Sequence, residues 1–155
     1  MSEYDPMAPL NIELKNRDFE RALVPEGTHT LQVVAAEAIP NKANDNLNVH
    51  ITSTLVNPTP TTKEGVTAQP GDRQFQTWDG VYATPAQQER GMDPLDTICS
   101  IVDALFGTTK VNRPDLNADT LNQMTGKQFQ GIVAHEDDPR YGKQDRLVRY
   151  LPLNG

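Results

Sequence analysis

The chain has 155 residues, a formal net charge of −7 and an apolar share of 36%. This length fits a single domain that buries about two-thirds of its unfolded surface. The acidic balance argues against indiscriminate binding to nucleic acid or to anionic membranes. The sequence contains no apolar run of about 18 residues and opens with no basic-then-apolar signal segment, so we expect a soluble, intracellular protein.

The first part of the chain divides into a polar tail and the start of a β-domain. Residues 1–22 are predicted to be a tail or an added edge, because acidic residues outnumber basic ones five to two over residues 1–20. Residues 23–155 are predicted to form one domain, with a first strand over 28–34 and a loop over 40–46. Residues 47–52 alternate apolar and polar, which indicates a half-buried strand with Asn48, His50 and Thr52 facing outward.

The middle of the chain predicts a long loop, a third strand and a helix. Residues 57–71 are rich in Pro, Thr and Gly and are predicted to form a long flexible hairpin loop. A third strand is expected over 73–78. The helix is predicted from Asp93 as N-cap to Gly107. Its apolar face, at helical spacing, comprises Leu95, Ile98, Ile101, Val102 and Leu105. A short helical turn is predicted over 118–124.

The end of the chain predicts a locally basic hairpin. Two strands, over 125–135 and 146–152, are expected to flank a polar loop over 136–145. Residues 127–155 carry five basic and four acidic side chains, whereas the preceding residues carry nine and seventeen. Alternation in the last strand predicts that Leu147 and Leu151 face the core and that Arg146 and Tyr150 face solvent. Such a hairpin is where a polyanion would be expected to bind.

The predicted order is strand, strand, strand, helix, strand, strand. This is the element order of an OB-type barrel, so we predict a mainly β fold: a five-stranded OB-like barrel with its helix between strands 3 and 4. Other small β-barrels and sandwiches share much of the same pattern and remain alternatives.

Four segments resemble a known family, the phage-encoded single-stranded DNA-binding proteins of OB-like fold. They are Leu23-Val24-Pro25-Glu26-Gly27-Thr28, Ala104-Leu105-Phe106-Gly107, Thr125-Gly126-Lys127-Gln128-Phe129-Gln130-Gly131-Ile132-Val133 and Arg146-Leu147-Val148-Arg149-Tyr150-Leu151-Pro152. The resemblance implies binding of single-stranded DNA without sequence preference, to protect single strands in replication or recombination. It also implies a place in the cytoplasm of the infected host cell, with phage or host replication and recombination proteins as further partners. Self-association is left open.

A binder of this kind needs cations along the phosphates and flat rings on which bases stack, at about 1–3 kcal/mol each. The candidate nucleic-acid-binding residues are Arg73, Trp78, Tyr82, Lys127, Arg140, Tyr141, Lys143, Arg146 and Arg149. Trp78 is either such a stacking ring or a plug in the core, and Tyr141 is either a ligand contact or an ordinary surface side chain. Arg146 could instead pair with the acids at 136–138. The hypothesis predicts that affinity falls steeply as salt rises.

Catalytic and metal signatures are missing from the sequence. His29, His50, His135 and Cys99 lack the spacing of a zinc site, and the acids at 136–138 lack the spacing of a calcium loop. No phosphate loop or nucleophile elbow is present, so we expect no enzyme activity, no metal and no cofactor. The main alternative is a phage virion or assembly protein built on a small β-domain, and a weaker one is an inhibitor that mimics DNA.

Overall fold

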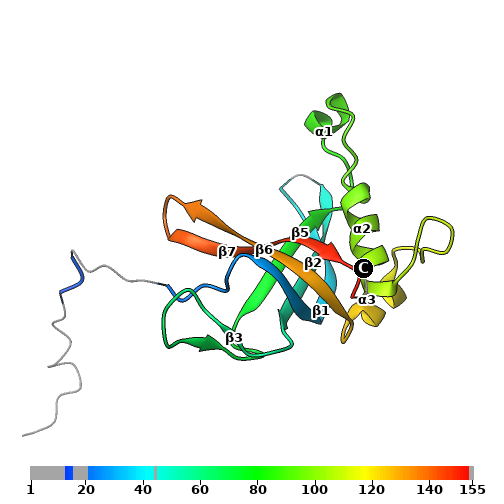
Figure 1. The fold of residues 1–155 in the computed structure, drawn as a ribbon. Coiled ribbons are helices and arrows are strands. Elements are labelled where there is room, and N and C mark those ends of the chain that lie inside the picture. Colours follow the sequence, from blue (N-terminus) through cyan, green and yellow to red (C-terminus); the bar gives the residue numbers. More distant parts are fainter. Residues whose placement is uncertain (1–12, 16–20, 44, 154–155) are drawn as a thin grey trace, which may run out of the picture.

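The computed structural model describes residues 13–15, 21–43 and 45–153, so most of the predicted tail at 1–22 lies outside the described residues. The chain is mainly β, with 42% strand and 18% helix, as predicted. Five long strands form one antiparallel sheet in the order β5-β2-β1-β6-β7 (Figure 1). Their bounds are Gly27–Asn41 (β1), Asn46–Leu55 (β2), Gln74–Gly80 (β5), Gln128–Asp138 (β6) and Gly142–Leu151 (β7).

Strands β1 and β2 form the centre of the sheet. In β2 the alternation is as predicted, since Val49 and Ile51 are buried while His50 stays partly exposed. Strand β1 extends well beyond the predicted residues 28–34 and pairs with β2 on one side and with β6 on the other. A register shift between Val33 and Ala35 marks a bulge, which bends this long strand. Residues 40, 41 and 46 of the predicted loop belong to these strands, and the described residues between them, 42, 43 and 45, form a turn as predicted.

The sheet is not closed. Strands β5 and β7 are its two edges, and no backbone ladder joins them within the described sheet. They are linked by side chains instead: Arg73 pairs with Asp145, and the hydroxyls of Thr77 and Tyr150 lie 2.7 Å apart. The structure therefore has an open, twisted five-stranded sheet where the sequence predicted an OB-like five-stranded barrel.

Helix α2 (Leu95–Phe106) follows β5 and covers one end of the sheet, as the helical spacing predicts (Figure 1). Ile98, Ile101, Val102 and Leu105 are buried in the core, whereas Leu95 at the start of the helix stays exposed. The helix ends at Gly107, whose φ of 66° is left-handed. No helix of the described residues is long and apolar enough to cross a membrane.

The two other helices are short. Helix α3 (Ala118–Met124) occupies the residues where a helical turn was predicted, and its Leu121 and Met124 join the core. Helix α1 (Pro85–Glu89) was not predicted. It is held by a capping box between Thr84 and Gln87 and stands away from the body of the protein (Figure 1).

The predicted loop at 57–71 contains a small two-stranded ribbon, β3 (Thr59–Pro60) and β4 (Thr67–Ala68). The ribbon is tied to the chain just before the sheet. Leu23 N–H donates to the Thr62 hydroxyl (3.1 Å), and Thr62 N–H donates to the Leu23 carbonyl (2.8 Å). The segment that leads into β1 is thereby tied to the ribbon.

The last strand corrects one prediction. The β6–β7 register shifts between Ile132 and Val133, which leaves Val148 as a bulge in β7. One extra residue reverses the alternation beyond it, so Tyr150 points inward and stacks on Phe129 with ring centroids 4.5 Å apart. The prediction that Tyr150 faces solvent is therefore wrong, while Leu147 is buried as predicted. The predicted loop at 136–145 narrows to a turn at 139–141.

Candidate nucleic-acid interface

A groove runs between the two edge strands of the sheet. Two adjoining hollows, of about 540 and 300 Å³, share Gln76, Trp78 and Leu147 as lining residues. We call this channel the edge groove. Its charged and aromatic lining residues are Arg73, Trp78 and Asp79 from the β5 side, Asp96 from α2, and Asp145, Arg146, Arg149 and Tyr150 from β7.

Trp78 lies on the rim of the edge groove, stacked on a histidine. His50 of β2 and Trp78 of β5 are direct partners in the sheet register, with ring centroids 3.7 Å apart and ring planes 15° apart. Nε2 of His50 lies 3.1 Å from Oε1 of Gln76, and Nδ1 lies 3.5 Å from a carboxylate oxygen of Glu37. The indole remains 53% exposed. Trp78 is therefore not a core plug, and His50 supports its ring from one side.

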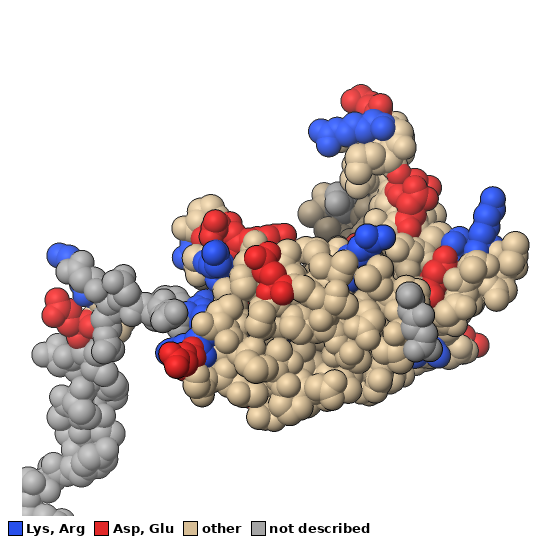
Figure 2. All heavy atoms as spheres, in the orientation of Figure 1, with Lys and Arg blue, Asp and Glu red and all other residues tan. Residues whose placement is uncertain are grey.

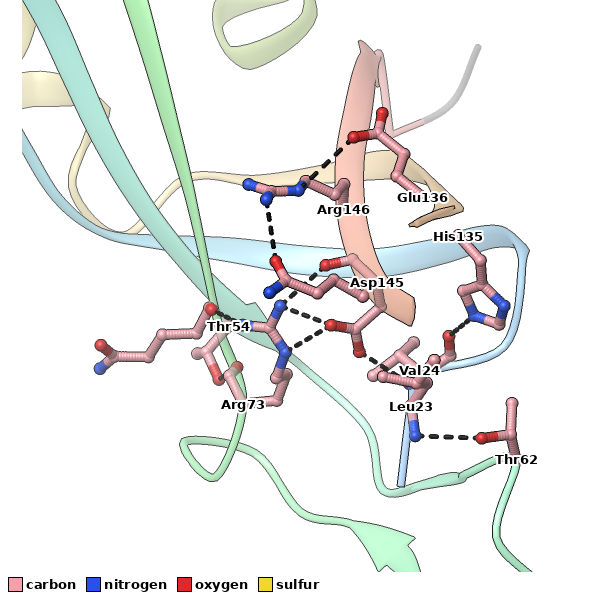
Figure 3. A network of polar contacts seen from close by, with 11 residues as sticks. Leu23, Val24, Thr54, Thr62, Arg73, His135, Glu136, Asp145 and Arg146 are labelled. Atoms are coloured by element: carbon pink, nitrogen blue, oxygen red, sulfur yellow. Dashed lines mark hydrogen bonds and ion pairs between the residues drawn. The ribbon is translucent and has the colours of Figure 1, made fainter. Parts of the chain in front are cut away.

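Arg73 is committed to an ion pair. Its Nε and Nη2 lie 2.9 and 2.5 Å from Oδ1 of Asp145, and Nη2 also donates to the Asp145 carbonyl at 2.9 Å (Figure 3). The other carboxylate oxygen accepts the Val24 N–H at 2.8 Å. Burial alone would raise the pKa of Asp145, but the hydrogen bonds from Arg73 and Val24 outweigh it and hold the pKa below 3.8. Arg73 therefore ties the strands together, and its charge is neutralised.

Two further arginines line the groove from β7. Arg146 donates to Gln144 at 2.8 Å, and its Nε lies 3.5 Å from a carboxylate oxygen of Glu136 (Figure 3). The sequence predicted such a pairing with the acids at 136–138 as the alternative role of Arg146. Arg149 is exposed, and no carboxylate of the described residues lies within ion-pair distance of it. Arg149 is thus the cation of the groove that is available to a phosphate.

The five remaining candidates lie elsewhere. Tyr82 and Tyr141 are 61% and 58% exposed, and the guanidinium of Arg140 lies 5.6 Å from the centroid of the Tyr141 ring. Nζ of Lys127 lies 4.8 Å from the centroid of Phe106. None of these residues, nor Lys143, lines the edge groove. The structure thus brings together Arg73, Trp78, Arg146 and Arg149 and leaves the others apart.

The described residues on the face drawn in Figure 2 form no broad basic patch. Basic side chains stand beside acidic ones there, and most of this face carries neither. The edge groove itself is lined by three arginines and by three aspartates, Asp79, Asp96 and Asp145. Charge alone would therefore attract a polyanion only weakly, and stacking on Trp78 has to contribute.

Polar side chains lie at the floor of the groove. The Tyr150 hydroxyl lies 2.7 Å from the Thr77 hydroxyl, and burial raises the Tyr150 pKa to about 12. Nearby, Asp79 is half-buried, and burial raises its pKa above 3.8. The hydroxyl of Ser53 is fully buried and does not line the edge groove. Thr77 and Asp79, which line the groove and are only partly buried, are the side chains of this part that can exchange hydrogen bonds with a ligand.

Two of the histidines are engaged by the backbone. Nε2 of His29 lies 2.7 Å from the Pro25 carbonyl, and Nε2 of His135 lies 2.7 Å from the Val24 carbonyl. Within the part of the chain that the structure describes, no three His, Cys, Asp or Glu side chains converge as a metal site would require.

Comparison with models of protein families and with curated protein sequences gave no match to this chain.

Proposed function

We propose that this protein binds single-stranded DNA in the edge groove, with little dependence on sequence. The observation that carries the proposal is the pairing of a half-exposed indole, supported by His50, with an unpaired Arg149 on the opposite wall. Bases stack on an indole whatever their identity, and a guanidinium neutralises the phosphate between them. A ring and a cation on facing walls suit a flexible single strand.

The proposed fold is an OB-like barrel that is open between β5 and β7. In its favour, β1 pairs with both β2 and β6, and α2 lies between the third and fourth long strands. On this interpretation the edge groove replaces the missing strand pairing of the barrel. The proposed role is protection of exposed strands during phage replication or recombination in the host cytoplasm, as the family resemblance implies.

The charges in the groove change the expected salt dependence. Arg73 is neutralised by the buried Asp145, whereas the exposed pair of Arg146 with Glu136 can exchange for a phosphate, so Arg146 as well as the unpaired Arg149 can contact phosphates in the groove. Each phosphate contact to a single strand contributes about 0.7 to the slope of log affinity against log salt. We therefore propose a shallow slope of about −1.4 instead of the steep dependence expected from the sequence.

A mobility-shift assay at two salt concentrations tests the proposal. The probes are a mixed-sequence single strand of about 16 nucleotides and the matching duplex. The proposal expects a shift with the single strand and a weaker one with the duplex, whose bases are not free to stack on Trp78. No shift at low salt would refute it. A chain that ignores both probes and sediments as large particles would belong to the virion or assembly class.

A further inference from the structure

We propose that Asp79 and Asp96 give the edge groove a base preference: it accepts bases that carry an exocyclic amino group and disfavours thymine. This inference rests on the proposed function and concerns the same groove. It makes these two carboxylates specificity-determining residues.

The two carboxylates line the same hollow of the edge groove as Trp78 and Arg149. Asp79 follows Trp78 directly on β5, and both residues line the larger hollow of the groove. Asp96, in the first turn of α2, lines the same hollow, with Arg149 and Tyr150 also in its wall. A nucleotide that stacks on Trp78 and contacts Arg149 through its phosphate therefore has these acids within the same hollow.

Among the described residues, no group donates a hydrogen bond or forms an ion pair to the side chain of Asp79, which is partly buried, or of Asp96, which is exposed. Asp145, at the other end of the groove, accepts from Arg73 and Val24, and its pKa is lowered, whereas burial raises the pKa of Asp79. A half-buried carboxylate without donors favours a ligand that brings its own N–H groups.

The chemistry of the bases then sets the preference. Cytosine, adenine and guanine each carry an amino group that donates to a carboxylate, whereas thymine presents carbonyl acceptors at the corresponding positions. A carboxylate facing those carbonyls is repelled and loses its water without compensation. Stacking on Trp78 is similar for both pyrimidines. Any difference in affinity between cytosine and thymine therefore reports on contacts to the edge of the base.

The quenching of Trp78 fluorescence by oligo-dC and oligo-dT of equal length tests this inference. The chain has one tryptophan, so the signal reports directly on the groove. We expect oligo-dC to bind about tenfold more tightly than oligo-dT, which corresponds to a single good carboxylate-to-amino contact. In Asp79→Asn, whose amide both donates and accepts, we expect the two affinities to become equal within about twofold.

Asp137→Asn is the matched control. It makes the same change in net charge, but Asp137 is exposed on β6 and does not line the groove, so the tenfold ratio should persist. Asp96→Asn should lower the ratio by a smaller factor and serves as the second variant if Asp79→Asn does not fold by circular dichroism. Equal binding of both oligonucleotides by the unaltered protein would overturn the inference and leave the proposed function standing. Binding of neither would overturn the proposed function itself.

Discussion

The guanidinium of Arg73, just before β5, and the carboxylate of Asp145 on β7 form an ion pair across the two edges of the sheet, with Nε–Oδ1 and Nη2–Oδ1 distances of 2.9 and 2.5 Å. The Asp145 side chain is almost completely buried, at 3% exposure. No backbone ladder joins these strands in the described sheet, and side-chain contacts such as this pair link the two edges. The same separation defines the edge groove.

Replacing Asp145 by alanine should strongly destabilise the fold. Arg73 and the Val24 N–H would both lose their buried acceptor, and breaking a buried pair on one side costs about 3–5 kcal/mol. Urea denaturation measures the loss. Glu136→Ala, which removes the exposed partner of Arg146, should cost less than about 1 kcal/mol. Equal losses in the two variants would show that the Asp145 pair does not hold the edges.

Acid should unfold the protein partly through Asp145. Its pKa is lowered on folding, since Arg73 and Val24 together outweigh the effect of burial, so the folded state binds this proton less readily than the unfolded chain. The stabilisation is complete above the ordinary aspartate pKa of about 3.8 and is lost as the pH falls through the lower, folded pKa.

Thermal melts at about pH 2 to 6 measure this effect. The melting temperature should fall below about pH 4, and it should fall less in Asp145→Asn. Asp103, whose pKa Arg113 lowers by hydrogen bonding, contributes in the same direction in both proteins. The difference between the two curves therefore isolates Asp145. If the melting temperatures of the unaltered protein and of Asp145→Asn fell in parallel with pH, Asp145 would not be a source of the acid sensitivity.

Gly131 should not tolerate a side chain. A Cβ at this position of β6 would lie 2.5 Å from Cδ1 of Leu31 and 2.7 Å from Cδ1 of Leu147, both in the core. Gly131→Ala should therefore cost about 1–3 kcal/mol through overpacking, measured by urea denaturation. Gly80→Ala is the control, because the nearest atom to its Cβ would be the side-chain amide nitrogen of Asn46, at 3.2 Å. A larger loss at Gly80 would count against this description of the core.

Removing the indole should weaken DNA binding without unfolding the protein. Trp78→Ala should lose about 1–3 kcal/mol of binding free energy for an oligonucleotide, the usual value of one stacked base. Trp78→Phe should retain part of the affinity. Tyr82→Ala, an exposed aromatic outside the groove, should bind as the unaltered protein does. If Tyr82→Ala lost more affinity than Trp78→Ala in a mobility-shift assay, the edge groove would not be the DNA-binding site.

Arg149 should set much of the salt dependence. Arg149→Gln should reduce the slope of log affinity against log salt by about 0.7, the contribution of one phosphate contact. Lys143→Gln removes a charge from the same strand but outside the groove, so its slope should not change. Equal slopes for Arg149→Gln and the unaltered protein would place the phosphates elsewhere.

β2, α2 and α3 could be predicted because the pattern that defines each of them lies within one short segment: alternation of apolar and polar residues in β2, and helical composition and spacing in α2 and α3. The bulge at Val148 could not be predicted from such local patterns, because it depends on the register between β7 and β6. It reverses the orientation that was expected for Tyr150. The pair of Arg73 and Asp145 joins residues 72 positions apart, so Asp145 appeared to be an ordinary loop acid. The open edge of the sheet likewise depends on long-range geometry.

The candidate site was predicted only in part. Trp78, Arg146 and Arg149 were identified by residue type, and the structure places them along one groove. The support that His50 gives to Trp78 follows from the β2–β5 register, which single-strand alternation does not specify. Tyr141 and Arg140 were selected because the hairpin is locally basic, but the turn carries them outside the groove.

The most direct test of the central claim is a titration of Trp78 fluorescence with a mixed-sequence single strand at low salt. The only tryptophan of the chain lies on the rim of the edge groove, so a base that stacks there must alter its emission. We predict saturable quenching by the single strand, reduced in Arg149→Gln, and little change with the matching duplex. Unchanged emission with the single strand would contradict the assignment of the edge groove as a single-strand binding site.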